Sequence, residues 1–511
     1  MRSQDSGCAG SLDGDQLEVT RAVTRFGVNV ALSVARSYGG ISASSRAKAN
    51  SFRRPDVMAR PIHLLFVLAL SACSGSEQPS ASPADAGLDA VVSSDAGPDG
   101  ALDAPSDAAT AWESNVACDY PGVRSVDAPA TADPNGPRIR FRYRVFEASP
   151  TAPWVFVVPG GPGQSLIAED ASSNFALGAV PTAQFNIVYV DARGSGCNVF
   201  PDLGTLPDED AYTIQRVASD VRAVIERESP DEYYLYGASF GTAVVTVAAH
   251  DLAQSAVPLP KSIVLEGALG RAFASFDEYF AAFKSEWARV QLLIPSSWRQ
   301  SLTAEPFGDP NGYTRYQWGA FVSQQLILGD YPGYGHLLSY WLNGLTANDA
   351  AANAYVQNFM SSVPAGIPSQ PSGGLFSTIA CRELWGHWLP GRELSGAELN
   401  AVGADLCSGM PRKDYDSVDY LSTIPAVYFH GPFDPTTTTA QAQYHFDNHH
   451  GSVRDFITVP NTAHTPLTLG LAARGCAPQV WQAIRGQQQL ATVVASCAQS
   501  GETIDLVHRD D

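Results

Sequence analysis

The stretch YYLYGASFGTAVVTVAAH, residues 233–250, decides the fold. It begins with a short apolar run typical of a buried strand, passes through a G-x-S-x-G turn, and continues in small and apolar residues typical of a helix. A serine between such a strand and helix sits in a strained turn, where Gly237 and Gly241 leave room for neighbouring backbone. The pattern therefore predicts that Ser239 is a nucleophile, with a plain glycine turn as the alternative.

Asp434 and His464, which come much later in the chain, complete the set of side chains that an activated serine needs. A serine hydroxyl is a poor nucleophile at neutral pH, so a histidine must accept its proton and a carboxylate must orient that histidine. Asp434 follows the apolar run of PAVYFHGPFDP, residues 425–435, and His464 ends RDFITVPNTAH, residues 454–464. Each alone is an ordinary loop residue, but the order Ser, Asp, His predicts a catalytic triad.

Backbone N–H groups for a developing oxyanion are predicted at two places. One is the amide of Phe240, directly after the serine. The other lies in PGGPG, residues 159–163, because glycines let the backbone approach a ligand closely. Pro162 has no N–H, so Gly161 is the first choice there and Gly160 the second.

The rhythm of apolar runs around these motifs predicts the fold class. Strands buried on both faces are indicated at residues 154–158, 185–190, 233–236, 263–265, 426–429 and 456–459. Residues 214–228 have a helical pattern, and residues 138–147 alternate as an antiparallel edge strand would. We therefore predict an α/β-hydrolase fold with a mostly parallel sheet, its core in residues 113–269 and 423–511. An inserted, largely helical cap is predicted over residues 270–422.

The N-terminal part of the sequence predicts export. Residues 58–73 combine a short basic segment, an apolar run too short to span a membrane, and small residues before Cys73. Because LSAC, residues 70–73, resembles the bacterial lipobox, Cys73 is the predicted lipidation site of an exported, membrane-anchored lipoprotein. A buried helix or an ordinary cleaved signal is the alternative. Residues 1–57 lack a domain pattern and are predicted to be a mis-assigned upstream extension.

Composition separates the tether from the folded part and excludes some partners. Residues 74–112 are rich in Asp, Ala, Gly, Ser and Pro, which predicts a disordered tether. A net charge of -20 without clustered Lys and Arg excludes nucleic acid as a partner. The aspartates lack EF-hand spacing and no Cys/His cluster is present, so we expect no metal and no cofactor.

The motifs together resemble one family. GGPG at 160–163, DARGSG at 191–196 and GASFG at 237–241, followed by Asp434 and His464, are similar to the prolyl aminopeptidase and tripeptidyl aminopeptidase family of α/β-hydrolase serine peptidases. The resemblance runs over residues 138–497. It implies a peptide substrate, release of N-terminal residues through an acyl-enzyme, and structural roles for Asp191 and Arg193.

The same resemblance implies a substrate-binding carboxylate in the cap. Glu383 is the candidate that would bind the free amine of a peptide, because a buried ammonium needs a partner. A surface glutamate paired with Arg382 is the alternative. A carboxylesterase or lipase using the same triad remains an alternative function, as does a non-catalytic binding protein of the same fold.

The cysteines fit an exported protein. Six remain once Cys8 is set aside with the upstream extension and Cys73 is lipidated, and an even number predicts disulfides. Short spacing suggests Cys381 with Cys407 and Cys476 with Cys497, which leaves Cys118 with Cys197.

Overall fold

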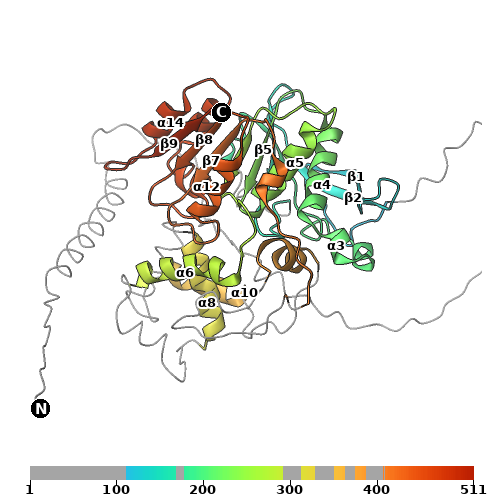
Figure 1. Cartoon of the computed structure of the whole chain (residues 1–511), viewed down its shortest axis with the longest axis horizontal. Coiled ribbons are helices and arrows are strands. Elements are labelled where there is room, and N and C mark those ends of the chain that lie inside the picture. The colour runs from blue at the N-terminus through green and yellow to red at the C-terminus, as the bar shows by residue number, and fades with distance from the viewer. Residues whose placement is uncertain are drawn as a thin grey trace, which may run out of the picture. The chain divides into compact units, whose positions relative to one another are not determined.

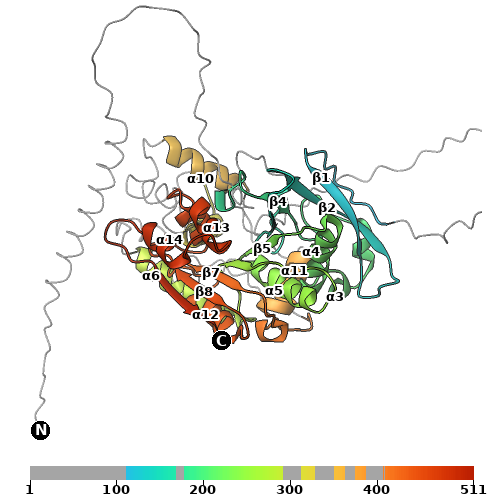
Figure 2. The ribbon, with the colours of Figure 1, turned by 90° about the horizontal axis from the view of Figure 1, so that it is seen from above.

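The computed structural model describes residues 111–167, 178–291, 312–328, 350–362, 374–386, 407 and 409–510 (Figures 1 and 2). The predicted signal with Cys73, the upstream extension and nearly all of the predicted tether lie outside these residues. Among the residues described, no helix combines the length and apolar character that crossing a membrane requires.

A nine-stranded sheet forms the centre of the fold, in the order β1-β2-β4-β3-β5-β6-β7-β8-β9. Its strands are β1 (Val123–Pro129), β2 (Arg138–Phe146), β3 (Trp154–Val158), β4 (Asn186–Tyr189), β5 (Tyr233–Ala238), β6 (Ile263–Glu266), β7 (Ala426–His430), β8 (Arg454–Thr458) and β9 (Asp505–Arg509). The six from β4 to β8 pair in parallel, whereas β1, β2 and β9 pair antiparallel.

Helices fill the connections between these strands. Those of the core are η1 (Pro201–Thr205), α3 (Asp208–Ala211), α4 (Ile214–Glu228), α5 (Phe240–Ala253), α12 (Thr439–Asn448), η5 (Pro466–Leu471), α13 (Ala477–Ile484) and α14 (Leu490–Ser496). Between β6 and β7 lie α6 (Phe276–Gln291), α8 (Arg315–Leu328), α10 (Ala350–Ser362), α11 (Leu375–Thr378), η2 (Ile379–Leu384) and η4 (Ser417–Tyr420). The described part of the insertion is therefore helical, and α6, α8 and α10 lie together beyond one end of the strands (Figure 1).

Two hydrophobic clusters, one on each face, explain why the strands are continuously apolar. Val158 and Leu265 belong to the cluster under α4, α5 and α12, whereas their neighbours Val157 and Val264 belong to the cluster under α13 and α14. Figure 2 shows these two groups of helices on opposite sides of the sheet. Successive side chains of a strand point to opposite faces, so a strand covered on both sides needs an apolar residue at every position.

The edges of the sheet differ from the prediction. Residues 138–147 were expected to form an antiparallel edge strand, and β2 is antiparallel, but β1 lies outside it. β9 forms the opposite edge. β1 (VRSVDAP) has one buried residue and β9 (DLVHR) has none, so neither has the apolar run by which the buried strands were recognised.

β2 holds an N-terminal strap, residues 111–120, through two backbone hydrogen bonds and through the side chain of Arg142. The N–H of Trp112 donates to the Arg138 carbonyl at 2.7 Å, and the Arg140 N–H donates to the Trp112 carbonyl at 2.8 Å. The Arg142 guanidinium donates to the Val116 carbonyl at 2.6 Å. Arg140 and Arg142 also each lie 3.7 Å from the carboxylate of Glu113 in the strap.

The strand order and the connections identify the fold. A strand, a serine turn and a helix occur at β5 and α5, the candidate acid follows β7, and the candidate base follows β8. A largely parallel sheet with these residues in this order, and with helices inserted between β6 and β7, is the α/β-hydrolase fold.

Candidate active site

Ser239 occupies the turn between β5 and α5 in a strained conformation. Its φ is 55° and its ψ is -123°, which non-glycine residues rarely adopt. A Cβ on Gly237 would lie 2.4 Å from the Gly241 carbonyl oxygen, and a Cβ on Gly241 would lie 2.2 Å from the Val158 carbonyl oxygen. Both glycines of the motif are therefore required sterically, because they let α5 approach β3 and β5.

The candidate acid and base form a buried pair. His464 Nδ1 lies 2.8 Å from Asp434 Oδ2, and both side chains are almost fully buried. The hydroxyl of Thr437 donates to the same carboxylate oxygen at 2.6 Å, and the N–H of Thr437 donates to Oδ1 at 3.0 Å. Thr437 was not predicted from the sequence. The run of threonines after Asp434 could have indicated it, because such a run suits a turn closed on an Asp side chain.

The electrostatics of this pair suit a general base. Burial disfavours the imidazolium of His464, but the Asp434 carboxylate and its hydrogen bond outweigh this and raise the pKa of His464 above its ordinary value. Burial likewise opposes ionisation of Asp434, yet the charge and hydrogen bond of His464 keep the pKa of Asp434 below its ordinary value. His464 Nε2 is buried and has no hydrogen-bond partner among the residues that the structure describes, so it is available to take a proton.

The end of β6 joins the serine turn to the histidine. The Ser239 N–H donates to the Glu266 carbonyl at 2.8 Å. The next residue, Gly267, has a φ of +61°, and a Cβ there would lie 3.0 Å from His464 Nδ1 and 3.0 Å from Thr437 Oγ1. Residues 266 and 267 therefore contact the nucleophile's backbone, the base and the threonine that holds the acid.

The two predicted sources of oxyanion donors, Phe240 and the glycine loop, both lie next to the serine. Phe240 is the first residue of α5, where backbone N–H groups have no partner within the helix. A Cβ on Gly160 would lie 3.1 Å from the Ser239 Cβ, so the structure places Gly160 against the nucleophile. Gly161 follows with a φ of +117°, which glycine adopts readily.

Asp191 fixes the chain that leaves this glycine loop. Its carboxylate accepts from the Ser165 hydroxyl at 2.5 Å, the Leu166 N–H at 2.7 Å and the Ile167 N–H at 3.2 Å. Burial raises the pKa of Asp191 to about 6. The Arg144 guanidinium donates to the Ile167 carbonyl at 2.8 Å, so the same turn is held from β2.

Arg193 anchors the DARGSG loop to α4 and to the end of β1. Its side chain is fully buried, and its Nη2 lies 2.6 Å from Asp220 Oδ1 in α4. The guanidinium also donates to the carbonyls of Pro129 and Ala130, at 2.7 Å and 2.8 Å. These contacts agree with the structural role expected for this arginine.

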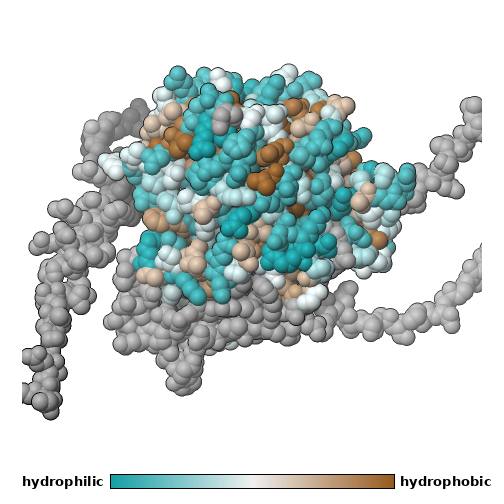
Figure 3. All heavy atoms as spheres, viewed as in Figure 1, coloured by the Kyte–Doolittle hydropathy of each residue, from teal (hydrophilic) through white to brown (hydrophobic). Residues whose placement is uncertain are grey.

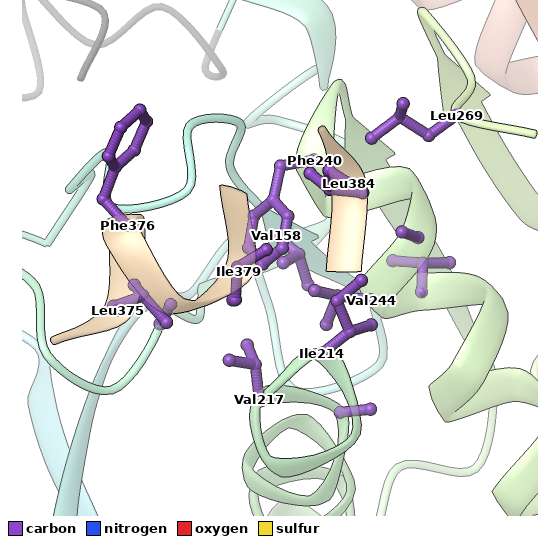
Figure 4. Close-up of a cluster of buried hydrophobic side chains, with 14 of the residues drawn as sticks. Val158, Ile214, Val217, Phe240, Val244, Leu269, Leu375, Phe376, Ile379 and Leu384 are labelled. Atoms are coloured by element: carbon purple, nitrogen blue, oxygen red, sulfur yellow. The ribbon is translucent and has the colours of Figure 1, made fainter. Parts of the chain in front are cut away.

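Glu383 is buried in the cap segment η2. Its side chain is only 5% exposed, and its Oε2 accepts a hydrogen bond from the Ile214 N–H at 2.8 Å, at the N-terminus of α4. Burial raises the pKa of Glu383 to about 7. The alternative of a surface glutamate is therefore wrong. Ile379 and Leu384 of η2 belong to the same buried hydrophobic cluster as Phe240 and Val158 (Figure 4).

Two cap helices reach the loops that carry the acid and the base. The N–H of His464 donates to the Ile327 carbonyl at 3.1 Å, near the C-terminal end of α8. The Arg289 guanidinium of α6 lies 4.1 Å from the centre of the Phe433 ring, one residue before Asp434. The cap therefore helps to position both loops.

Three disulfides join the six cysteines in the expected pairs: Cys118–Cys197, Cys381–Cys407 and Cys476–Cys497. The first follows the DARGSG loop directly, and the second ties the cap next to Glu383. Within the described ranges, no group of His, Cys, Asp and Glu side chains could hold a metal ion.

The surface in Figure 3 is mostly hydrophilic, with small and separated hydrophobic spots. Among the described residues, the exposed large hydrophobic side chains are Val116, Tyr120, Leu259, Leu421, Val453 and Val507. Val507 lies in β9, and the other five lie in connecting segments.

Comparisons with known proteins give structural neighbours only. No protein-family model matches the sequence, and no curated protein matches it. A proline iminopeptidase from Mycobacterium smegmatis is similar at 16% identity and a TM-score of 0.38, over 73% of this chain and 100% of that one. An esterase from Thermogutta terrifontis is similar at 15% identity and a TM-score of 0.37, over 72% and 99%. An esterase from Rhodococcus sp. ECU1013 is similar at 16% identity and a TM-score of 0.38, over 72% and 100%. At these TM-scores the fold assignment rests on the strand order and connections described above.

Proposed function

We propose that this chain is a serine hydrolase in which Ser239 attacks the carbonyl carbon of an acyl group. The observation that carries the proposal is the buried Asp434–His464 hydrogen bond of 2.8 Å, with His464 Nε2 unpaired within the described part of the chain. In the mechanism, Nε2 takes the serine proton and passes it to the leaving group, and Asp434 stabilises the imidazolium. The N–H groups of Phe240 and of the glycine loop at 160–161 stabilise the oxyanion, and water then hydrolyses the acyl-enzyme.

The substrate that we propose is a peptide with a free N-terminus. Glu383 supports this, because it is a buried carboxylate in a cap segment whose apolar residues share a cluster with Phe240, and a buried carboxylate suits a substrate ammonium. Its Oε2 holds the N-terminus of α4, so Oε1 is the oxygen that would face the amine. The enzyme would then act as an aminopeptidase that removes N-terminal residues.

One observation favours a carboxylesterase as the second candidate. One oxygen of Glu383 already accepts the Ile214 N–H, and burial raises the pKa of Glu383 to about 7. A carboxyl that is half neutral near pH 7 and committed to a helix is as well suited to a structural role as to binding a cation. The two candidates share the triad and differ in what the cap recognises.

We further propose that the protein is exported and anchored by a lipid on Cys73. The lipobox-like LSAC at residues 70–73 supports this, and the three disulfides suit an oxidising compartment. Mass spectrometry of the membrane fraction tests it: a diacylated N-terminal peptide beginning at Cys73 is expected. Recovery of an unmodified Cys73 in a chain that retains residues 58–72 would contradict it.

The activity is tested with the purified full chain and three groups of substrates: peptides with free N-termini, the same peptides acetylated, and short esters. Cleavage of the free-amine peptides alone supports the aminopeptidase. Equal cleavage of acetylated peptides and esters supports the esterase. Ser239→Ala must abolish either activity, and if an activity survives in that variant the serine-hydrolase proposal is wrong.

A further inference from the structure

Glu266, the last residue of β6, is a buried carboxylate that the mechanism above does not use. Its side chain is fully buried. Its Oε1 accepts the N–H of Thr468 at 2.8 Å, and its Oε2 accepts the hydroxyl of Thr468 at 2.7 Å and the hydroxyl of Tyr236. Each of these groups can donate, which is the arrangement that an ionised carboxylate requires.

The contacts of Glu266 connect the nucleophile with the base. Its carbonyl accepts the Ser239 N–H, as described above. Thr468 belongs to η5, which begins at Pro466, two residues after His464. The carboxylate therefore fastens the segment that follows His464 to the strand that supports the serine turn.

The charge of Glu266 has no basic partner among the described residues that hydrogen-bond to it. A buried charge needs compensation, and the cation that this site generates during catalysis is the imidazolium of His464. Burial disfavours that imidazolium, but the carboxylates of Asp434 and Glu266 outweigh burial and raise the pKa of His464. Burial also raises the pKa of Glu266 itself, while the hydrogen bonds from Tyr236 and Thr468 oppose that shift.

Three other groups near His464 do not supply a negative charge that could stabilise its imidazolium. His430 of β7 faces the pair, and burial lowers its pKa, so it is neutral. The last turn of α8, QLIL, accepts the hydrogen bond of the His464 N–H and carries no ionisable side chain. Arg289 of α6 stacks on Phe433 rather than on the imidazole.

We propose that Glu266 is a positioning residue for His464: it fixes the segment after the histidine through Thr468, and it places a second negative charge behind the imidazolium. The inference rests on the proposed serine-hydrolase function.

The test uses the full chain and a fluorophosphonate probe, which needs no knowledge of the substrate. Ser239 Oγ forms a bond to phosphorus, fluoride leaves, and the serine proton goes to His464, so the labelling rate rises with pH as His464 becomes neutral. We expect Glu266→Gln to move the midpoint of this rise down by roughly 0.5 to 1 pH unit and to lower the plateau rate roughly 3- to 10-fold.

Glu228→Gln is the matched control. Glu228 also accepts a tyrosine hydroxyl, from Tyr143, but it ends α4 and pairs with Arg124 at 2.6 Å. This variant should keep the wild-type midpoint and plateau. If Glu266→Gln does not fold by circular dichroism, Tyr236→Phe replaces it. That change removes one donor, favours the neutral acid at Glu266, and must move the midpoint in the same direction.

The outcomes separate the two proposals. A folded Glu266→Gln with the wild-type midpoint overturns the role of Glu266, as does an equal shift in Glu228→Gln, while labelling of the wild type leaves the hydrolase proposal standing. A wild type that is as inert to the probe as Ser239→Ala overturns the proposed function and this inference with it.

Discussion

Gly267 has no room for a side chain. Its φ is +61°, and a Cβ would lie 2.8 Å from the His464 carbonyl oxygen and 3.0 Å from its Nδ1. We expect Gly267→Ala to displace His464 and to lower kcat by at least roughly 10-fold, because small misplacements of a catalytic group are costly. Steady-state kinetics and the Tm measure both effects.

Gly475→Ala provides the control for Gly267→Ala. Its φ is +76°, but nothing lies within 4 Å of the added Cβ, so it carries the backbone strain without the contact. It should lose about 1 kcal/mol of stability and keep its activity. Equal losses of activity in the two variants would show that strain, rather than contact with His464, is responsible.

The pH dependence of activity follows from His464. The base must be neutral to accept the serine proton, and the pKa of His464 is raised above 6.5, with Asp434 outweighing the effect of burial. As the pH falls through that raised value, kcat/KM should fall tenfold per unit, with a midpoint above 6.5. A pH–rate profile of the full chain checks this, and a midpoint below the ordinary histidine value would contradict it.

Ser239, Asp434 and His464 could be proposed as a triad from the sequence, because each follows a buried strand and their order along the chain fits the fold. The contacts of Thr437, Glu266 and Gly267 with these residues could not be predicted, because they form only in the folded chain. Glu266 and Thr468, for example, are 202 positions apart, and no local pattern encodes that contact.

At the scale of elements, Glu383 links the cap to α4 and makes stability depend on pH. Burial raises its pKa from 4.5 to about 7, so the folded protein holds a proton that the unfolded chain releases. Stability from this group is therefore lost as the pH rises from 4.5 to about 7. Glu383→Gln keeps a carbonyl for the Ile214 N–H and removes the penalty, so we expect it to gain up to about 3 kcal/mol relative to wild type between pH 5 and pH 8.

Urea unfolding at about pH 5 and about pH 8 measures this change in the free energy of unfolding. The aminopeptidase proposal adds a second expectation for the same variant: KM for free-amine peptides rises, and KM for esters does not. A stability difference that does not depend on pH would show that Glu383 is not buried as an ionisable group.

The helices and strands with a regular pattern of buried apolar residues were predicted well. The sequence predicted β3 with its bounds, and it predicted α4 from its helical pattern, because both are read from periodic apolar residues. It missed β1 and β9, whose positions come from pairing with β2 and β8 rather than from their own composition. Strand pairing across a chain is a tertiary property, and exposed edges carry little apolar signal.

At the scale of the whole molecule, the three disulfides close loops of different length. The cysteines are separated by 79 residues in Cys118–Cys197, and by 26 and 21 in the other two pairs. In the chain-entropy account, replacing the first pair with serines costs about 4.5 kcal/mol and the shortest about 3.4 kcal/mol. Thermal unfolding of the two double variants should therefore show the larger drop in Tm for Cys118 and Cys197. The reverse order would point to unequal loss of native contacts.

The N-terminal strap determines how the protein would respond to mechanical load. A chain held by its N-terminus receives tension at residue 111, ahead of both β1 and β2. Pulling can break the two backbone hydrogen bonds between Trp112 and β2. At Cys118, however, the tension passes through the disulfide to Cys197, in the loop after β4. The force then enters the interior of the sheet and bypasses the edge strand β1, which would otherwise peel away first. If the chain is anchored through Cys73, as proposed above, tension on that anchor would leave the segment between Cys118 and Cys197, which includes the glycine loop at residues 159–163, outside the loaded path.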